Sequence, residues 1–332
     1  MPTARGRLAV LMSTIVPVRT LRPITAAESP TFAPRYATGR STSLAVMRIG
    51  VSIFATDTTL QPVALGEAVE ERGFESLWLP EHSHIPSSRA TPWGGVAGAA
   101  PLPEMYWRTH DQFLALAAIA ATTETLILGT GITLVAQRDP IWLAKQVASL
   151  DVISGGRVIF GIGYGWNKEE MANHGVAYLE RRAILRENVL AMKEIWANDE
   201  ASFAGDYVNI EPSWSWPKPI QRPHPPIVLG GGAGPKTFGD IAEFCDGWMP
   251  IAGRHEFTSR VESLHAAART AGRDPASLSL GIFGAPADAD QLRRFAAAGV
   301  TRAVLPVPSR SPDEVLARLD AYAPLVDELR DV

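Results

Sequence analysis

The chain has 332 residues, of which 46% are apolar and 20% charged, and its formal net charge is −4 at pH 7. A chain of this length and composition buries a sizeable core, which excludes a predominantly disordered protein. Its single cysteine, Cys245, cannot form an intrachain disulfide, so we expect a reducing, cytoplasmic location. The longest apolar run covers residues 113–121 and falls far short of the roughly 20 residues of a membrane span, so we expect no membrane helix.

Positive charge is concentrated at the start of the chain. Residues 1–46 contain six arginines and one acid, Glu28, for a net charge of +5, which leaves −9 on residues 47–332. An acidic body disfavours a nucleic-acid partner. The first segment has weak features of a signal or transit peptide. We interpret it as a disordered leader or a mis-set start, because Met47 stands directly before a strand-like pattern.

Eight β-rich runs alternate with eight helical patterns from Met47 onward. Strands are expected at residues 49–54, 76–79, 126–134, 157–162, 227–229, 247–251, 278–283 and 301–307. Helices are expected at residues 59–72, 109–122, 141–153, 181–196, 236–244, 256–271, 290–298 and 312–329. Two Pro- and Trp-rich insertions interrupt this alternation, one after the second strand and one over residues 199–226, which we interpret as a loop or lid.

This alternation predicts an α/β protein with a closed (β/α)8 TIM barrel and insertion loops, formed by residues 47–332 as a single domain. An open doubly wound sheet is less expected, because no G-x-G-x-x-G motif follows the first strand. Active sites of such barrels lie where the strands end at their carboxyl side. The residues that follow each strand are therefore the candidates for chemistry.

Glu81, His82 and His84 follow the second predicted strand. Imidazole titrates near neutral pH and a neighbouring carboxylate shifts it, so Glu81 and His82 are candidates for moving a proton. The same three side chains could form part of a metal site, but no further ligand has a suitable spacing. We predict a catalytic pair without a metal.

Two glycine-rich segments follow the third and fourth predicted strands. Gly129 and Gly131 flank Thr130, and glycines alternate with other residues from Gly161 to Gly165. Such glycines fit a bulge or a flat ligand close to the backbone. They equally fit a barrel interior that needs small residues, and both interpretations stay open.

A third glycine-rich segment, residues 230–234, precedes a predicted helix at Lys236. Exposed amides at a helix N-terminus bind anions, and phosphate is the natural occupant. Aromatic residues in the two insertions either line an apolar substrate pocket or form small cores of their own; they are Trp93, Tyr106, Trp107, Trp214 and Trp216.

In combination, these motifs resemble the luciferase-like monooxygenase superfamily of flavin and deazaflavin oxidoreductases over essentially all of residues 47–332. The resemblance is carried by Ser76-Leu-Trp-Leu-Pro-Glu-His, Leu128-Gly-Thr-Gly-Ile, Gly161-Ile-Gly-Tyr-Gly-Trp-Asn, Pro225-Pro-Ile-Val-Leu-Gly-Gly-Gly and Asp246-Gly-Trp. Residues 81–89 and 214–226 are similar to the branch that depends on deazaflavin, coenzyme F-420.

The resemblance implies a cofactor ring across the mouth of the barrel. It implies a non-prolyl cis peptide between Gly131 and Ile132, with Glu81 and His82 as the catalytic pair near the ring. The implied cofactor-binding residues are Thr130, Gly131, Ile132, Tyr164, Gly165, Asn167, Gly230, Gly231 and Gly232.

The expected reaction is hydride transfer between the deazaflavin and a small organic substrate. Trp166 stands where relatives that oxidise a sugar phosphate carry a catalytic Glu. That difference argues for a more apolar substrate. An FMN-dependent two-component monooxygenase is the main alternative, and a non-catalytic flavin-binding protein is another. The resemblance also implies a homodimer.

Overall fold

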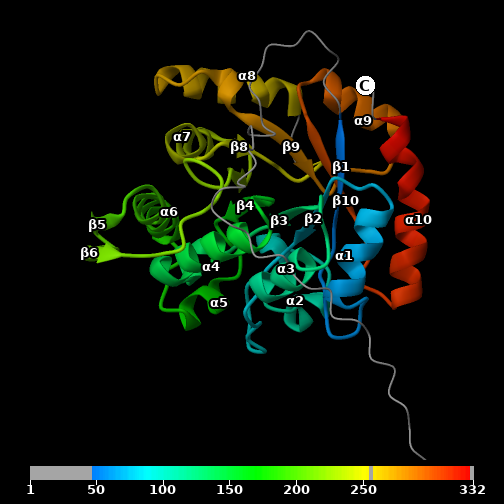
Figure 1. Ribbon diagram of the computed structural model, residues 1–332, viewed down its shortest axis with the longest axis horizontal. Coiled ribbons are helices and arrows are strands. Elements are labelled where there is room, and N and C mark those ends of the chain that lie inside the picture. Colours follow the sequence, from blue (N-terminus) through cyan, green and yellow to red (C-terminus); the bar gives the residue numbers. More distant parts are fainter. Residues whose placement is uncertain (1–46, 254–256, 330–332) are drawn as a thin grey trace, which may run out of the picture. The chain divides into compact units, whose positions relative to one another are not determined.

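Eight parallel strands close into a barrel in the order β1-β10-β9-β8-β7-β4-β3-β2. The computed structural model describes residues 47–253 and 257–329, and helices surround the barrel strands (Figure 1). The predicted α/β fold, a (β/α)8 TIM barrel, is confirmed. The barrel strands are β1 (Arg48–Ser52), β2 (Ser76–Leu79), β3 (Ile127–Thr130), β4 (Val158–Gly163), β7 (Ile227–Gly230), β8 (Gly247–Trp248), β9 (Ser279–Phe283) and β10 (Arg302–Pro306).

One helix of each predicted unit packs outside the barrel. These are α1 (Pro62–Glu71), α3 (Gln112–Ala120), α4 (Pro140–Ile153), α6 (Arg181–Ala197), α7 (Pro235–Phe244), α8 (Phe257–Thr270), α9 (Ala289–Ala297) and α10 (Pro312–Glu328). Two short helices were not expected from the sequence, α2 (Met105–Arg108) and α5 (Lys168–Asn173). The 3-10 turns are η1 (Trp93–Gly95), η2 (Val135–Gln137) and η3 (Pro275–Ser277).

The interpretation of residues 1–46 as a leader or mis-set start lies outside the described residues. Within the described part, no helix combines the length and the apolar character needed to cross a bilayer.

Local signals explain where the helices begin. The Asp139 carboxylate accepts a hydrogen bond from the Trp142 amide at 2.9 Å, and Pro140 occupies the first position of α4, where a missing backbone donor costs nothing. Asp111 caps α3 in the same way through the Leu114 amide at 2.9 Å. The predicted starts of these helices are therefore correct to within a few residues.

Two predicted strands are shorter than expected. The sixth predicted strand, residues 247–251, forms a ladder only over β8; Pro250 has no amide hydrogen to donate, and Ile251 pairs again only in an isolated bridge with Phe283. The third strand ends at Thr130, and only Thr133 pairs again, in an isolated bridge with Ile162. Both truncations leave irregular backbone at the carboxyl end of the barrel.

The second insertion was predicted to be a loop or lid, and the structure differs from that prediction. It contains an antiparallel hairpin, β5 (Glu200–Ala204) and β6 (Asn209–Trp214), which lies beside α6 (Figure 1). The Glu187 carboxylate on α6 accepts hydrogen bonds from the amides of Asp206, Tyr207 and Val208 at 2.7 to 3.0 Å. The prediction failed because the two strands are short and their stability depends on this distant carboxylate.

Trp78 fills the interior of the barrel. The side chain is fully buried, and its ring nitrogen donates to the Ser76 hydroxyl at 2.9 Å. A Cβ on Gly129 would lie 2.2 Å from the Trp78 ring, and a Cβ on Gly161 would lie 1.9 Å from the Thr130 carbonyl oxygen and 3.4 Å from the ring. For Gly129 and Gly161, the interpretation as small interior residues is therefore the correct one.

We predict that Gly129→Ala lowers the free energy of unfolding by about 1–3 kcal/mol, because the added methyl group overlaps the Trp78 ring. Gly239→Ala in α7 is the matched control, since nothing lies within 4 Å of the Cβ it would add. We expect the control to be neutral or more stable by up to about 1 kcal/mol, because alanine favours helix. Urea unfolding measures both variants, and equal midpoints for Gly129→Ala and the parent chain would contradict the packing described for Trp78.

Candidate active site

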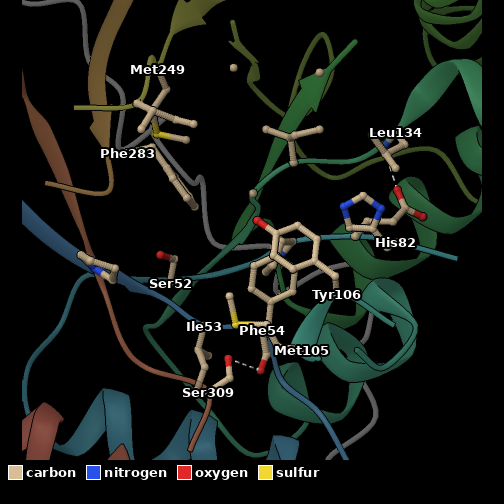
Figure 2. A pocket seen from close by; sticks show the side chains of 18 of the residues that line it. Ser52, Ile53, Phe54, His82, Met105, Tyr106, Leu134, Met249, Phe283 and Ser309 are labelled. Atoms are coloured by element: carbon tan, nitrogen blue, oxygen red, sulfur yellow. Dashed lines mark hydrogen bonds between the residues drawn. The ribbon is translucent and has the colours of Figure 1, made fainter. Parts of the chain in front are cut away.

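A cavity of about 800 Å³ lies where the barrel strands end (Figure 2). Its volume is in the range of small-molecule sites, roughly 300–1,000 Å³. Residues that follow each of the eight barrel strands contribute to its wall, as the barrel architecture predicts. The wall includes Ser52, Ile53, Phe54, Glu81, His82, Gly131, Ile132, Gly163, Tyr164, Gly165, Trp166, Gly230, Gly231, Gly232, Met249, Ile251, Phe283, Val307 and Ser309.

The peptide bond between Gly131 and Ile132 is cis, as the resemblance implied. A Cβ on Gly163 would lie 2.5 Å from the Ile132 side chain, and one on Gly230 would lie 2.9 Å from it. These two glycines therefore leave room for Ile132 between the ends of β4 and β7. The result is a floor of backbone and one aliphatic side chain beneath the cavity, which we call the Gly131–Ile132 floor.

The segment 230–234 precedes the N-terminus of α7 and lines one side of the cavity through Gly230, Gly231 and Gly232. Among the described residues, the backbone amides of 231–234 have no hydrogen-bond acceptor. The Gly231 carbonyl oxygen accepts from the Trp248 ring nitrogen at 3.1 Å, which orients the segment. Free amides next to a ten-residue helix suit an anion. Lys236 is exposed and does not line the cavity.

His82 is held by a carboxylate that the sequence analysis missed. Its Nδ1 lies 2.7 Å from Oε2 of Glu170 on α5, and the Glu170 side chain is fully buried. Oε1 of Glu170 accepts from the Ser83 amide at 3.2 Å. Since Nδ1 is engaged, Nε2 is the ring nitrogen left for a ligand. A carboxylate on Nδ1 fixes the tautomer and the orientation of the ring.

Aromatic rings frame His82 on the cavity wall. The centroid of the Tyr106 ring lies 5.1 Å from that of the His82 ring, and Figure 2 shows the two side by side. The centroid of the Trp166 ring lies 5.8 Å from that of the His82 ring. Of the insertion aromatics predicted to line a pocket, Tyr106 does so and Trp93 packs against its ring. Trp107, Trp214 and Trp216 do not line the cavity; they are 47%, 80% and 56% exposed. Of the two alternatives for these three, the pocket wall is therefore excluded.

Glu81 lies on the cavity wall, but both of its carboxylate oxygens are engaged. One accepts from the Leu134 amide at 2.7 Å, and the other is paired with the Arg138 guanidinium. Through these contacts Glu81 connects the segment after β2 to the segment after β3. Its part in catalysis stays a prediction.

Tyr164 belongs to a polar cluster behind the cavity wall. Its hydroxyl donates to Oδ2 of Asp240 at 2.5 Å, and the Arg182 guanidinium contacts that same oxygen at 2.8 Å. Burial, followed by the Asp240 carboxylate, raises the pKa of Tyr164 well above its ordinary value. The phenol therefore stays neutral and keeps its ring fixed beside Gly165.

Two predicted cofactor contacts do not line the cavity. The Thr130 hydroxyl is buried and donates to the Gly161 carbonyl oxygen at 2.7 Å. Asn167 is 1% exposed, and neither its Nδ2 nor its Oδ1 has a hydrogen-bond partner among the described residues. The other seven predicted positions all lie on the wall.

His84 was the third side chain considered as a possible metal ligand. Its Nδ1 lies 2.9 Å from the Ser83 hydroxyl, and its Nε2 lies 2.8 Å from Asn173. In residues 47–253 and 257–329, no cluster of three or more histidine, cysteine or acidic side chains is placed to hold a metal ion.

Known proteins resemble this chain over most of its length. An uncharacterized protein of Mycobacterium tuberculosis is 37% identical over 279 residues, 83% of this chain and 98% of that protein. The F420-dependent hydroxymycolic acid dehydrogenase of the same organism is 28% identical over 249 residues, 72% of this chain and 64% of its own. The FMNH2-dependent dimethylsulfone monooxygenase of Pseudomonas putida is 34% identical over 142 residues, 42% of this chain and 38% of that protein.

A solved structure supports the fold. An F420-dependent secondary alcohol dehydrogenase superposes with a TM-score of 0.67 at 20% identity and covers 86% of this chain and 100% of that one. The profile of the luciferase-like monooxygenase family matches residues 47–297. Members of this family that resemble the chain are F420-dependent oxidoreductases and FMN-dependent monooxygenases. The chain therefore belongs to the luciferase-like monooxygenase family.

Proposed function

We propose that the protein is a coenzyme F-420 (deazaflavin) dependent oxidoreductase that transfers a hydride between this cofactor and a small, largely apolar organic substrate. One observation carries the proposal. The Gly131–Ile132 floor and the free amides of Gly231 and Gly232 line a single cavity together with His82, whose ring is held by the buried Glu170. That cavity offers a surface for a flat ring, donors for an anion and a group that can move a proton.

The residues present fit such a cofactor. A flat ring can rest on the floor, because only backbone and the aliphatic Ile132 side chain form it. A phosphate can accept hydrogen bonds from the amides of 231–234 at the N-terminus of α7. When bound, a deazaflavin supplies two-electron hydride chemistry.

His82 would manage the proton that accompanies the hydride. Oxidation of an alcohol releases one hydride and one proton, and Nε2 of His82 would accept the proton while Glu170 stabilises the charge on the ring. Reduction would run the same transfer backwards. The rings of Tyr106 and Trp166 exclude water from this side of the cavity.

Two alternatives use the same cavity. The similarity to the FMNH2-dependent dimethylsulfone monooxygenase favours a two-component FMN-dependent monooxygenase as the second candidate. A non-catalytic flavin-binding protein would need the floor and the amides but not His82. We favour deazaflavin because F420-dependent relatives align over a larger share of the chain.

We also propose a homodimer in a cytoplasmic location. Neighbouring helices α3 and α4 expose Leu114 (75%), Trp142 (70%) and Ile141 (45%). Such side chains suit an interface with a second copy of the chain. The buried, unpaired thiol of Cys245 suits a reducing compartment.

The cofactor assignment predicts that the purified chain binds coenzyme F-420 more tightly than FMN. Calorimetric titration of the cofactor-free chain with each oxidised cofactor measures the difference, and mass spectrometry identifies any cofactor that co-purifies. Micromolar binding of FMN together with no binding of F-420 would assign the protein to the monooxygenase alternative.

The anion-binding loop and the proton-transfer residue are predicted to respond differently to substitution. In Gly231→Val the side chain meets Tyr164 and Thr237, whose atoms lie 3.4 Å from the added Cβ, and its methyl groups crowd the adjacent amides. We expect cofactor binding to weaken about tenfold or more, the loss that one charge-assisted hydrogen bond accounts for. Gly239→Ala, on α7 but away from the cavity, should bind as the parent chain does.

His82→Ala should keep most of the cofactor affinity and lose about 100-fold in turnover, because general acid–base catalysis contributes at least that factor. Turnover is followed as the loss of oxidised F-420 absorbance with a panel of apolar secondary alcohols as hydride donors. Unchanged turnover in His82→Ala would show that another group moves the proton. Equal losses of binding in His82→Ala and Gly231→Val would show that the phosphate site is misplaced.

A further inference from the structure

Arg318 on α10 is an exposed, cavity-lining cation that forms no ion pair with another residue in the described part of the chain. The other acidic or basic residues on the described cavity wall are Glu81 and His82, and both are paired, with Arg138 and Glu170. The Arg318 guanidinium makes no hydrogen bond or ion pair with another described residue. Its recorded contact is with the Tyr322 ring, at 5.5 Å from the ring centroid.

Hydrogen bonds hold the segments that surround Arg318 in place. The Tyr322 hydroxyl donates to the Pro306 carbonyl oxygen at 3.0 Å, which ties α10 to the end of β10. The Ser309 hydroxyl donates to the Phe54 carbonyl oxygen at 2.9 Å, which ties the segments after β10 and β1 together. Arg318 is therefore presented at a defined edge of the cavity, next to the ends of β1 and β10.

This edge is distinct from the proposed phosphate site. In the barrel order, β8 and β9 separate β10 from β7, which carries the free amides of residues 231–234. Between the two lies an apolar wall that includes Met249 after β8 and Phe283 at the end of β9, and Figure 2 shows both across the cavity from His82. One cavity thus contains two separate positive regions joined by apolar surface.

We infer that the substrate is an organic carboxylate with an apolar body, whose carboxylate binds Arg318. The planar guanidinium matches a carboxylate with two parallel hydrogen bonds. The apolar body would lie along the Phe54 and Met105 side of the cavity and bring its reacting carbon toward His82. The position of the reacting carbon rests on the proposed function, whereas the carboxylate site rests on Arg318 alone.

Octanoate and 1-octanol are suitable probes, because they share an apolar chain and differ in charge. Each is titrated calorimetrically into the full chain without added cofactor. The variants are Arg318→Gln and the matched control Arg310→Gln, which removes the same charge from an exposed residue that does not line the cavity. Thermal melts verify that both variants are folded.

We expect octanoate to bind the parent chain and Arg310→Gln equally, and to bind Arg318→Gln about tenfold more weakly, as expected for one charge-assisted contact at a partly solvated site. 1-Octanol should bind all three proteins alike and more weakly than octanoate. Equal octanoate affinity in Arg318→Gln and the parent chain would overturn the inference. Octanoate binding no tighter than that of 1-octanol would overturn it as well.

A parallel titration with F-420 separates a substrate carboxylate from an anionic group of the cofactor. We expect Arg318→Gln to bind F-420 as the parent chain does. A tenfold loss of F-420 affinity in Arg318→Gln would assign Arg318 to the cofactor and overturn the inference. Arg318-dependent octanoate binding in a chain that does not bind F-420 would support the carboxylate site and refute the proposed function.

Discussion

The Trp78 ring inside the barrel sets the level at which the cavity begins. Its bulk is accommodated because Gly129 carries no side chain, since a Cβ there would lie 2.2 Å from the ring. A Cβ on Gly131 would lie 3.2 Å from the Trp78 Cβ, so the floor of the cavity rests directly on this residue. Close packing of this kind holds the floor at a fixed height in the barrel.

The polar groups around the cavity are joined in pairs that bridge different elements. Arg138 with Glu81 joins the segments after β2 and β3, and Glu170 with His82 joins α5 to the segment after β2. Buried ion pairs add little to net stability, because desolvation offsets most of their attraction. Their value here is geometric: the cavity wall is ordered before any ligand arrives, which reduces the entropy lost on binding.

The barrel and much of the site could be predicted because their signals are local. Alternating strand and helix patterns, a proline after Asp139 and glycine runs after strands each constrain nearby backbone. Glu170 could not be predicted in this way, because its significance comes from His82, 88 residues earlier in the chain. The hairpin β5–β6 likewise depends on Glu187. Arg318 was missed because an exposed arginine on a late helix has no sequence motif.

The glycine-rich segments illustrate where sequence reasoning reaches its limit. The same pattern serves several purposes, since Gly129 makes room for the Trp78 ring and Gly161 for the Thr130 carbonyl oxygen, whereas Gly163 and Gly230 make room for Ile132. Gly161 and Gly163 are two residues apart and lie on the same face of β4, so their depth along the barrel decides which neighbour each one meets.

The aromatic residues beside His82 also give the protein an optical property. Trp166 and Tyr106 form part of the cavity wall, whereas Trp142 and Trp214 are 70% and 80% exposed to solvent. A conjugated ring bound on the floor would lie close to Trp166 and would accept its excitation energy more efficiently than that of the distant surface indoles. Trp166 thus reports on the cavity, and the exposed tryptophans serve as an internal reference. A bound conjugated ring would therefore change the shape of the tryptophan emission spectrum without any attached dye.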